Sequence, residues 1–291
     1  MTYLTASGQS VQKWGDSSGR RVFVSLVRAG FRRYSTYRQA TIAGLFTNTV
    51  FGFLHCYVVL AVAAGAPLAA DGSRTAAGYT GQQLATFVWV GQGLLTVVML
   101  WGWSDLATRI KSGEIVADLL RPVHPVFSYY ATDLGRAGFA VLTRFLPPIA
   151  VSAFVFDLYV PHRWSSYPLF VVSAFCAVTI SFCCRYLVNS TAYWLDGDGR
   201  GPMMSWQLAG GLFSGLYFPL PFLPDWLVAV LWVATPFPSL LQAPLDVLLE
   251  RGGTGHQLAI VAGQIAWLAV MWGACFYVQR RAEHRMVIQG G

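Results

Sequence analysis

Residues 103–136 read WSDLATRIKSGEIVADLLRPVHPVFSYYATDLGR, and they form the longest polar run that is flanked on both sides by apolar segments of membrane length. Apolar side chains recur in this run at helical spacing and charged side chains oppose them: Leu106, Ile110, Ala117 and Leu120 against Arg109, Lys111, Glu114 and Asp118. Gly113 weakens the pattern midway and Pro122 ends it. The run therefore predicts two short amphipathic helices in water, over 105–112 and 114–120.

These two helices need a surface to cover their apolar faces. The faces are too small to form a core alone, so we expect them to lie on the membrane surface or to dock into a groove of another protein.

The composition of the chain is that of a polytopic membrane protein. It has 291 residues, of which 55% are hydrophobic and only 11% are charged, and the apolar residues come in long runs. The five cysteines lie inside these runs, where they behave as small hydrophobes and indicate neither a disulfide framework nor a metal site. The net charge of +7 is explained by anionic lipid, so no nucleic-acid partner is expected.

Apolar runs of about 20 residues predict the membrane spans. They lie at 40–64, 84–103, 137–160, 168–188, 203–220 and 258–278. Residues 223–249 are also apolar, but prolines interrupt them, and a segment there that dips in and returns leaves both termini on one side. Most of the lysines and arginines then collect on that side, as the positive-inside rule requires.

We therefore expect an all-α membrane protein with six transmembrane helices and both termini in the cytoplasm. An outer re-entrant hairpin of two half-helices is expected over 223–249, between the fifth and sixth spans. Residues 1–19 are polar and are expected to be disordered, and 20–38 alternate arginines with apolar residues, as in an amphipathic helix at the membrane interface. The transmembrane domain then covers 40–281, with a cytoplasmic loop at 104–136, and 282–291 form a cytoplasmic tail.

Two motifs resemble a known family. Residues 111–122, KSGEIVADLLRP, resemble the cytoplasmic loop of the type-2 permeases of ATP-binding cassette (ABC) exporters. Residues 213–220, FSGLYFPL, followed by LPDWL at 223–227 and TPF at 235–237, are similar to the signature after the fifth span of those permeases.

The resemblance implies a role for each motif. It implies that the loop forms a coupling helix and contacts an ATPase subunit through Glu114, Ile115, Asp118, Leu119 and Leu120. It also implies that the outer half-helices close the pathway, with Pro219, Pro224, Trp226 and Pro236 in this gate.

The resemblance also implies partners in the cell membrane. No P-loop motif occurs in the chain, so ATP and magnesium are expected in a separate cytosolic ATPase and no cofactor on this chain. A second permease, identical or related, completes the pore, and the cargo is an amphipathic compound such as a drug, an antibiotic, a lipid or a peptide.

Few polar side chains lie inside the predicted spans. Asn48 and His55 share a face of the first span, and Gln92 lies in the second. They fit either hydrogen bonds between helices, worth about 0.6 kcal/mol each, or a partly polar lining of the pathway. Arg144 lies near the cytoplasmic edge of the third span and is expected to snorkel.

Two other functions remain open from the sequence. A proton-coupled secondary exporter would use His55, although no acidic residue occupies the middle of a predicted span, where carriers place such a group. A membrane scaffold without transport would leave the polar face of the first span without a function.

Overall fold

A computed structural model describes residues 17–65, 75–101, 105–195 and 200–289 of the chain. The described part is helical and contains no strand, apart from an isolated bridge between Ala76 and Tyr79. Most of the N-terminal segment that we predict to be disordered lies outside the described residues.

Twelve α-helices and four short helical turns follow one another in the described residues. In chain order they are α1 Ser17–Ser35, α2 Arg38–Ala64, α3 Gly81–Val98, α4 Asp105–Lys111, α5 Ile115–Leu119, α6 Pro125–Ala140, the π-helical turn η1 Val141–Phe145, α7 Leu146–Ala153, α8 Ser166–Ser190, η2 Thr191–Tyr193, α9 Arg200–Phe213, η3 Leu220–Phe222, α10 Asp225–Ala234, η4 Phe237–Ser239, α11 Gln242–Leu248 and α12 Gly253–Gln289.

Within the described residues, four helical segments are long and apolar enough to cross a membrane. They are Gln39–Ala64, Pro125–Ala153, Ser166–Tyr193 and Gly253–Arg285, and each matches one of the predicted runs. The other two runs contain α3 and α9. Helix α9 has 14 residues and is about 21 Å long, short of the roughly 30 Å of a bilayer core.

Helix α3 forms the centre of the core. Nearly every residue from Leu84 to Val98 is buried, and α2, α6, η1, α7 and α8 pack around it. A capping box between Thr80 and Gln83 starts the helix, and Met99 in the left-handed conformation (φ 61°) ends it. In the described part of the predicted run 84–103, which reaches residue 101, the helix therefore ends at Val98.

Helix α6 begins earlier than the sequence predicts. We expect a cytoplasmic loop to Arg136 and a span from 137, but the helix starts at Pro125, where the amide of Val126 donates to Nδ1 of His124. Proline suits the first turn of a helix, because the amide that it lacks would have no helical partner there. The polar residues after Pro125 are helical because they find partners on neighbouring helices, so the loop ends at about residue 124.

Helix α1 packs directly on α6. Gly30 of α1 lies against the main chain of Thr132, and Gly135 of α6 lies against the main chain of Val27, so that a Cβ at either glycine would overlap backbone atoms. The predicted helix 20–38 differs from α1 at both ends. Helix α1 starts at Ser17 and ends at Ser35, and α2 begins at Arg38.

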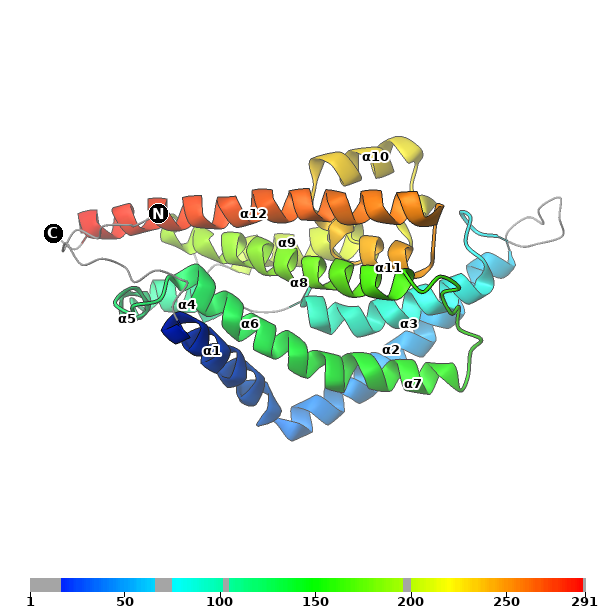
Figure 1. The fold of residues 1–291 in the computed structure, drawn as a ribbon, viewed down its shortest axis with the longest axis horizontal. Helices are drawn as coiled ribbons and strands as arrows, with labels where there is room; N and C mark the ends of the chain where they lie inside the picture. Colours follow the sequence, from blue (N-terminus) through cyan, green and yellow to red (C-terminus); the bar gives the residue numbers. More distant parts are fainter. Residues whose placement is uncertain (1–16, 66–74, 102–104, 196–199, 290–291) are drawn as a thin grey trace.

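The proline-rich segment folds into short helices. Helices α10 and α11 have 10 and 7 residues, or about 15 and 10 Å, and neither is long enough to cross a bilayer. Residues Gln242 to Val247 of α11 are buried, whereas α10 is largely exposed. In Figure 1, α10 lies on the outside of α12, and the indole of Trp267 on α12 donates to the Trp232 carbonyl on α10.

Figure 1 shows α4, α5 and the C-terminal part of α12 at one end of the molecule, and the connection between α7 and α8 at the opposite end. Residues 282–289 continue α12, so the predicted C-terminal tail is part of that helix as far as Gln289.

At that opposite end, Glu250 fastens two connections together. Its carboxylate accepts hydrogen bonds from the Ser166 hydroxyl over 2.7 Å, the Arg163 amide over 2.8 Å and the Tyr159 hydroxyl over 2.9 Å. Burial raises the pKa of Glu250, but these hydrogen bonds outweigh it and lower the pKa to about 2.

Candidate functional site

The first part of the polar run 103–136 forms a helix, a turn and a second helix, as predicted. Helices α4 and α5 are separated by Gly113, which adopts a left-handed conformation (φ 76°) that suits glycine. An ion pair of 2.6 Å between Arg33 and Asp105 joins α1 to the start of α4. The sequence pattern thus determines both the helices and the break between them.

Part of the apolar surface of this loop docks on the chain itself. Leu106 and Ile115 are buried in one cluster with apolar residues of three long helices: Val126 and Tyr130 of α6, Phe182 and Tyr186 of α8, and Cys275 of α12. The expectation that this face lies on the membrane or in a groove of another protein is therefore wrong for Leu106, whereas Ala117 and Leu120 of the predicted face are exposed. It overlooked the first turns of α6, which provide a surface within the chain.

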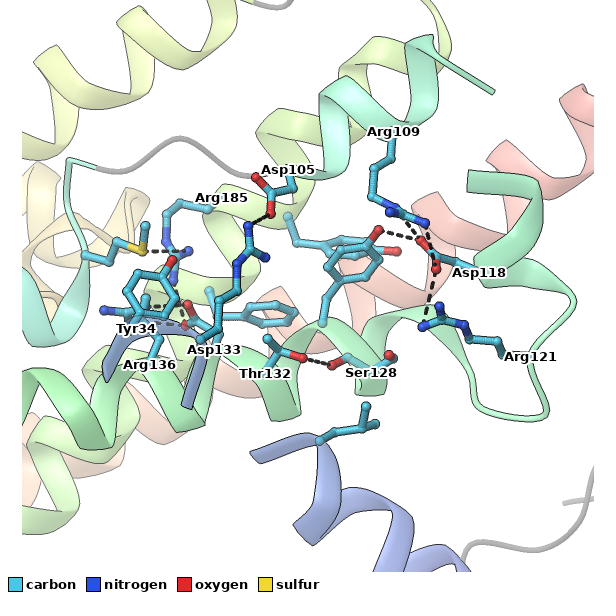
Figure 2. Close-up of a pocket in the computed structure, with 16 residues that line it drawn as sticks. Tyr34, Asp105, Arg109, Asp118, Arg121, Ser128, Thr132, Asp133, Arg136 and Arg185 are labelled. Carbon is cyan, nitrogen blue, oxygen red and sulfur yellow. Dashed lines mark hydrogen bonds and ion pairs between the residues drawn. The ribbon is translucent and has the colours of Figure 1, made fainter. Parts of the chain in front are cut away.

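Asp118 fastens α5 to α4 and α6. Its carboxylate accepts two hydrogen bonds from Arg109, over 2.8 and 3.1 Å, and one from the Tyr129 hydroxyl over 2.8 Å, and its side chain is 10% exposed. The hydrogen bond to Asp118 raises the pKa of Arg109, despite partial burial. Figure 2 shows Arg109 and Arg121 on either side of Asp118.

The solvent-facing side of α5 differs from the contact set that the resemblance implies. Glu114 and Leu120 are exposed, the latter to 82%, and Leu119 is half-buried. Ile115 and Asp118 are buried within the chain. Val116, which is 52% exposed, and Ala117 share the outer surface.

A buried charge cluster lies on α6 and α8 beside this loop (Figure 2). Asp133 accepts from Arg136 over 2.7 Å and from Arg185 over 2.8 Å, and all three side chains are buried. Arg136 also donates to the main-chain carbonyls of Thr96 and Val97 at the end of α3. The cluster carries one net positive charge and lines a cavity of about 240 Å³ together with Asp105, Arg109 and Asp118.

A second and larger cavity runs along α2. It has a volume of about 1020 Å³ and is lined by α2, α3, α6, η1 and the segment around Tyr217. We call it the α2 groove. Asn48, His55 and Gln92 all line it, so the structure brings the three predicted pathway residues together.

These three side chains also bond to one another or to the nearby main chain. The Asn48 amide donates to the Gln92 carbonyl over 3.2 Å, Nδ1 of His55 lies 3.5 Å from Nε2 of Gln92, and Nε2 of His55 lies 2.7 Å from the Tyr217 carbonyl. An amide nitrogen and a carbonyl can be satisfied together only if Nδ1 accepts and Nε2 donates. This arrangement fits a neutral imidazole.

A comparison with known protein families agrees with this helical membrane architecture. Residues 69–290 match the model of the ABC-2 family transporter proteins, which is well over half of the chain. The chain belongs to this family. It matches no curated protein and no solved structure. As an ABC-2 family transporter protein, it is a membrane component of a transport system, and permeases of this family typically work with ATPase subunits.

In this ABC-2 family protein, the predicted gate residues lie where short helices begin. Pro219 precedes η3, Pro224 precedes α10 and Pro236 precedes η4, while Trp226 is exposed on α10. Gln242 of α11 fixes this segment, because its side-chain oxygen accepts from the Leu220 amide over 2.9 Å and its main-chain amide donates to the Ser214 carbonyl over 2.8 Å.

Sequence reasoning missed several residues of this ABC-2 family protein. It counted Arg136 and Arg185 among the cations on the cytoplasmic side and gave them no partner, whereas the structure buries both against Asp133. The i,i+3 spacing of Asp133 and Arg136 was the available signal. Among the described residues, no group of three or more histidine, cysteine or acidic side chains could hold a metal ion.

Proposed function

We propose that this protein is the permease subunit of an ABC exporter in the cell membrane. It pairs with a second permease and with two cytosolic ATPase subunits, which bind ATP and magnesium, and the complex exports an amphipathic compound. The observation that carries this proposal is the α4–α5 loop: ion pairs and a buried cluster hold it at one end of the molecule while apolar side chains face outward.

The proposed topology has six spans, with α3 and α9 as the second and fifth. Helices α10 and α11 then form the outer re-entrant hairpin, and both termini lie in the cytoplasm, on the same side of the membrane as the loop. The burial of α3 supports this topology, because a span enclosed by other helices tolerates more polar residues than one that faces lipid. Charge bias supports the same orientation.

The proposed ATPase contact uses the exposed face of the loop. It comprises Glu114, Val116, Ala117 and Leu120, whereas Ile115 and Asp118 hold that face in place from inside. A push on α5 passes through Asp118 to Tyr129 of α6, which belongs to a continuous helical segment up to Ala153. The loop is thus a rigid contact for an ATPase that changes shape.

The α2 groove is the proposed half-pathway, and the second permease would supply the facing half. Asn48, His55 and Gln92 provide its polar wall, and the hairpin with Pro219, Pro224, Trp226 and Pro236 closes it on the outer side. Among the described residues, no carboxylate lines this groove beside His55. This favours ATP over a proton gradient as the energy source.

Co-purification tests the proposal. The full chain is purified from native membranes in mild detergent, and a P-loop ATPase that hydrolyses ATP is expected with it. A variant with Val116→Arg and Leu120→Arg should lose the ATPase, because charge and bulk replace the apolar contact. Trp164→Arg is the matched control, since this exposed aromatic residue lies in the α7–α8 connection at the other end.

Two results would count against the proposal. One is the absence of any ATPase under conditions that keep other membrane complexes intact. The other is an equal loss of ATPase in the loop variant and in the Trp164→Arg control, which would indicate general damage.

A further inference from the structure

The α2 groove combines an apolar wall with cationic side chains. Two arginines, Arg136 and Arg144, line it, and no aspartate or glutamate among the described residues does so. Its volume of about 1020 Å³ lies at the upper end of the range for sites that hold drug-sized ligands.

The two arginines differ in how they are satisfied. The guanidinium of Arg136 has partners within the chain, because it donates to Asp133, which it shares with Arg185, and to two main-chain carbonyls of α3. Arg144 donates to the Ala40 carbonyl over 3.2 Å, and within the described residues no carboxylate pairs with it. Arg144 is partly buried, so its guanidinium is open to an anion that enters the groove, and an apolar surrounding strengthens such a pair.

The backbone is arranged to place Arg144 in the groove. It lies in the π-helical turn η1, a feature that is frequent at functional sites. On the facing helix, Gly44 leaves the space that the guanidinium occupies, and a Cβ there would overlap it. The side chain lies against the start of α2, where its guanidinium reaches Ala40, the first residue of the predicted first span.

The groove is polarised along α2. Arg144 meets the helix near Ala40, whereas Phe51, Leu54 and Val58 line the groove farther along. The distance from Ala40 to Val58 along a helix is about 27 Å. A molecule with an acidic group at one end and an extended apolar body matches this distribution.

We propose that the α2 groove binds an acidic amphiphile, with its carboxylate or phosphate on Arg144 and its apolar body along Phe51, Leu54 and Val58. That this amphiphile is the exported compound rests on the proposed function. The binding itself does not, so it can be tested without an ATPase.

The test compares an acid with its uncharged ester. The full chain is placed in nanodiscs of phosphatidylcholine and titrated with dansylaminoundecanoic acid or its methyl ester, with dansyl fluorescence as the signal. We expect the acid to bind at least about tenfold more tightly than the ester, since a charge-assisted pair forms in an apolar site.

Three variants separate charge from folding. Arg144→Gln should weaken binding of the acid to the level of the ester and leave the ester unchanged. Arg144→Lys should retain most of the preference. Arg121→Gln, on the exposed loop outside the groove, should behave as the wild type.

Several outcomes would overturn the proposal. Equal affinities for acid and ester in the wild type would do so, and so would an unchanged preference in Arg144→Gln. Displacement of the probe by phosphatidylglycerol, with the same dependence on Arg144, would instead support the binding site and identify a membrane lipid as its occupant in place of cargo. Failure of both probes, together with efficient cross-linking between two copies of Phe51→Cys, would assign the groove to a second copy.

The outcomes also separate this proposal from the proposed function. A chain that prefers the acid but carries no ATPase keeps the binding site and fails as an exporter subunit. A chain that carries the ATPase but shows no preference for the acid supports the exporter subunit and lacks the proposed binding site.

Discussion

Replacing Asp118 with alanine tests whether the α4–α5 loop is held from inside. The substitution removes two hydrogen bonds from Arg109 and one from Tyr129 at a carboxylate that is 10% exposed. Breaking such a buried pair costs about 3–5 kcal/mol. Arg109 keeps Glu114 at 3.2 Å and is 29% exposed, so we take about 3 kcal/mol, or on the order of 100-fold in the equilibrium for opening the loop.

Amide hydrogen exchange of peptides that cover α4 and α5 measures this equilibrium directly. Exchange in Asp118→Ala should accelerate on the order of 100-fold, with little change in α3 or α12. Glu114→Gln is the control, because its pair with Arg109 is on the surface and is worth at most about 1 kcal/mol. If both variants exchange at the same rate, Asp118 is not the anchor and the rigid-contact argument fails.

Three further predictions concern stability. The pKa of Glu250 is lowered to about 2 from an ordinary value of 4.5, so its contribution to the stability of the fold is complete above about pH 5 and is lost as the pH falls toward 2. The difference in melting temperature between the wild type and Glu250→Gln should therefore shrink over this range, and a constant difference would contradict this expectation. His55→Leu should lower the free energy of unfolding by about 1 kcal/mol in denaturant titrations, through the lost bond to the Tyr217 carbonyl, and a neutral result would leave that bond without a role. Gly135→Leu should force α1 from α6 at a cost of about 1–3 kcal/mol and speed tryptic cleavage within α1, whereas Gly138→Leu has room beside Phe31; equal cleavage rates would refute the close packing.

The helical class, the positions of four long apolar segments and the two loop helices could be predicted from the sequence. Each depends on local patterns: run length for the spans, and Gly113 and Pro122 for the loop. The start of α6 could not be predicted in this way. Polar residues such as Tyr129 and Asp133 suggested water, and only their partners on α5 and α8 make them part of a buried helix.

The same distinction between local patterns and contacts across the fold applies to the candidate site. Asn48, His55 and Gln92 could be selected because a polar group in an apolar run is visible in the sequence, and all three line one groove. The role of Asp118 as an internal anchor could not, because it depends on Arg109, nine residues earlier, across the turn at Gly113. Arg144 was noticed for its charge, but its direction depends on η1 and Gly44.

Arg136, Met99 and Tyr34 border both the cavity at the loop and the α2 groove. The two cavities therefore share these three side chains, and a movement of any of them changes the lining of both. Thermodynamic reciprocity then applies: if an ATPase on the loop alters the affinity of the groove, a compound in the groove must alter the affinity of the loop for the ATPase by the same factor. Binding of cargo in the groove would in this way change how tightly the ATPase binds the loop.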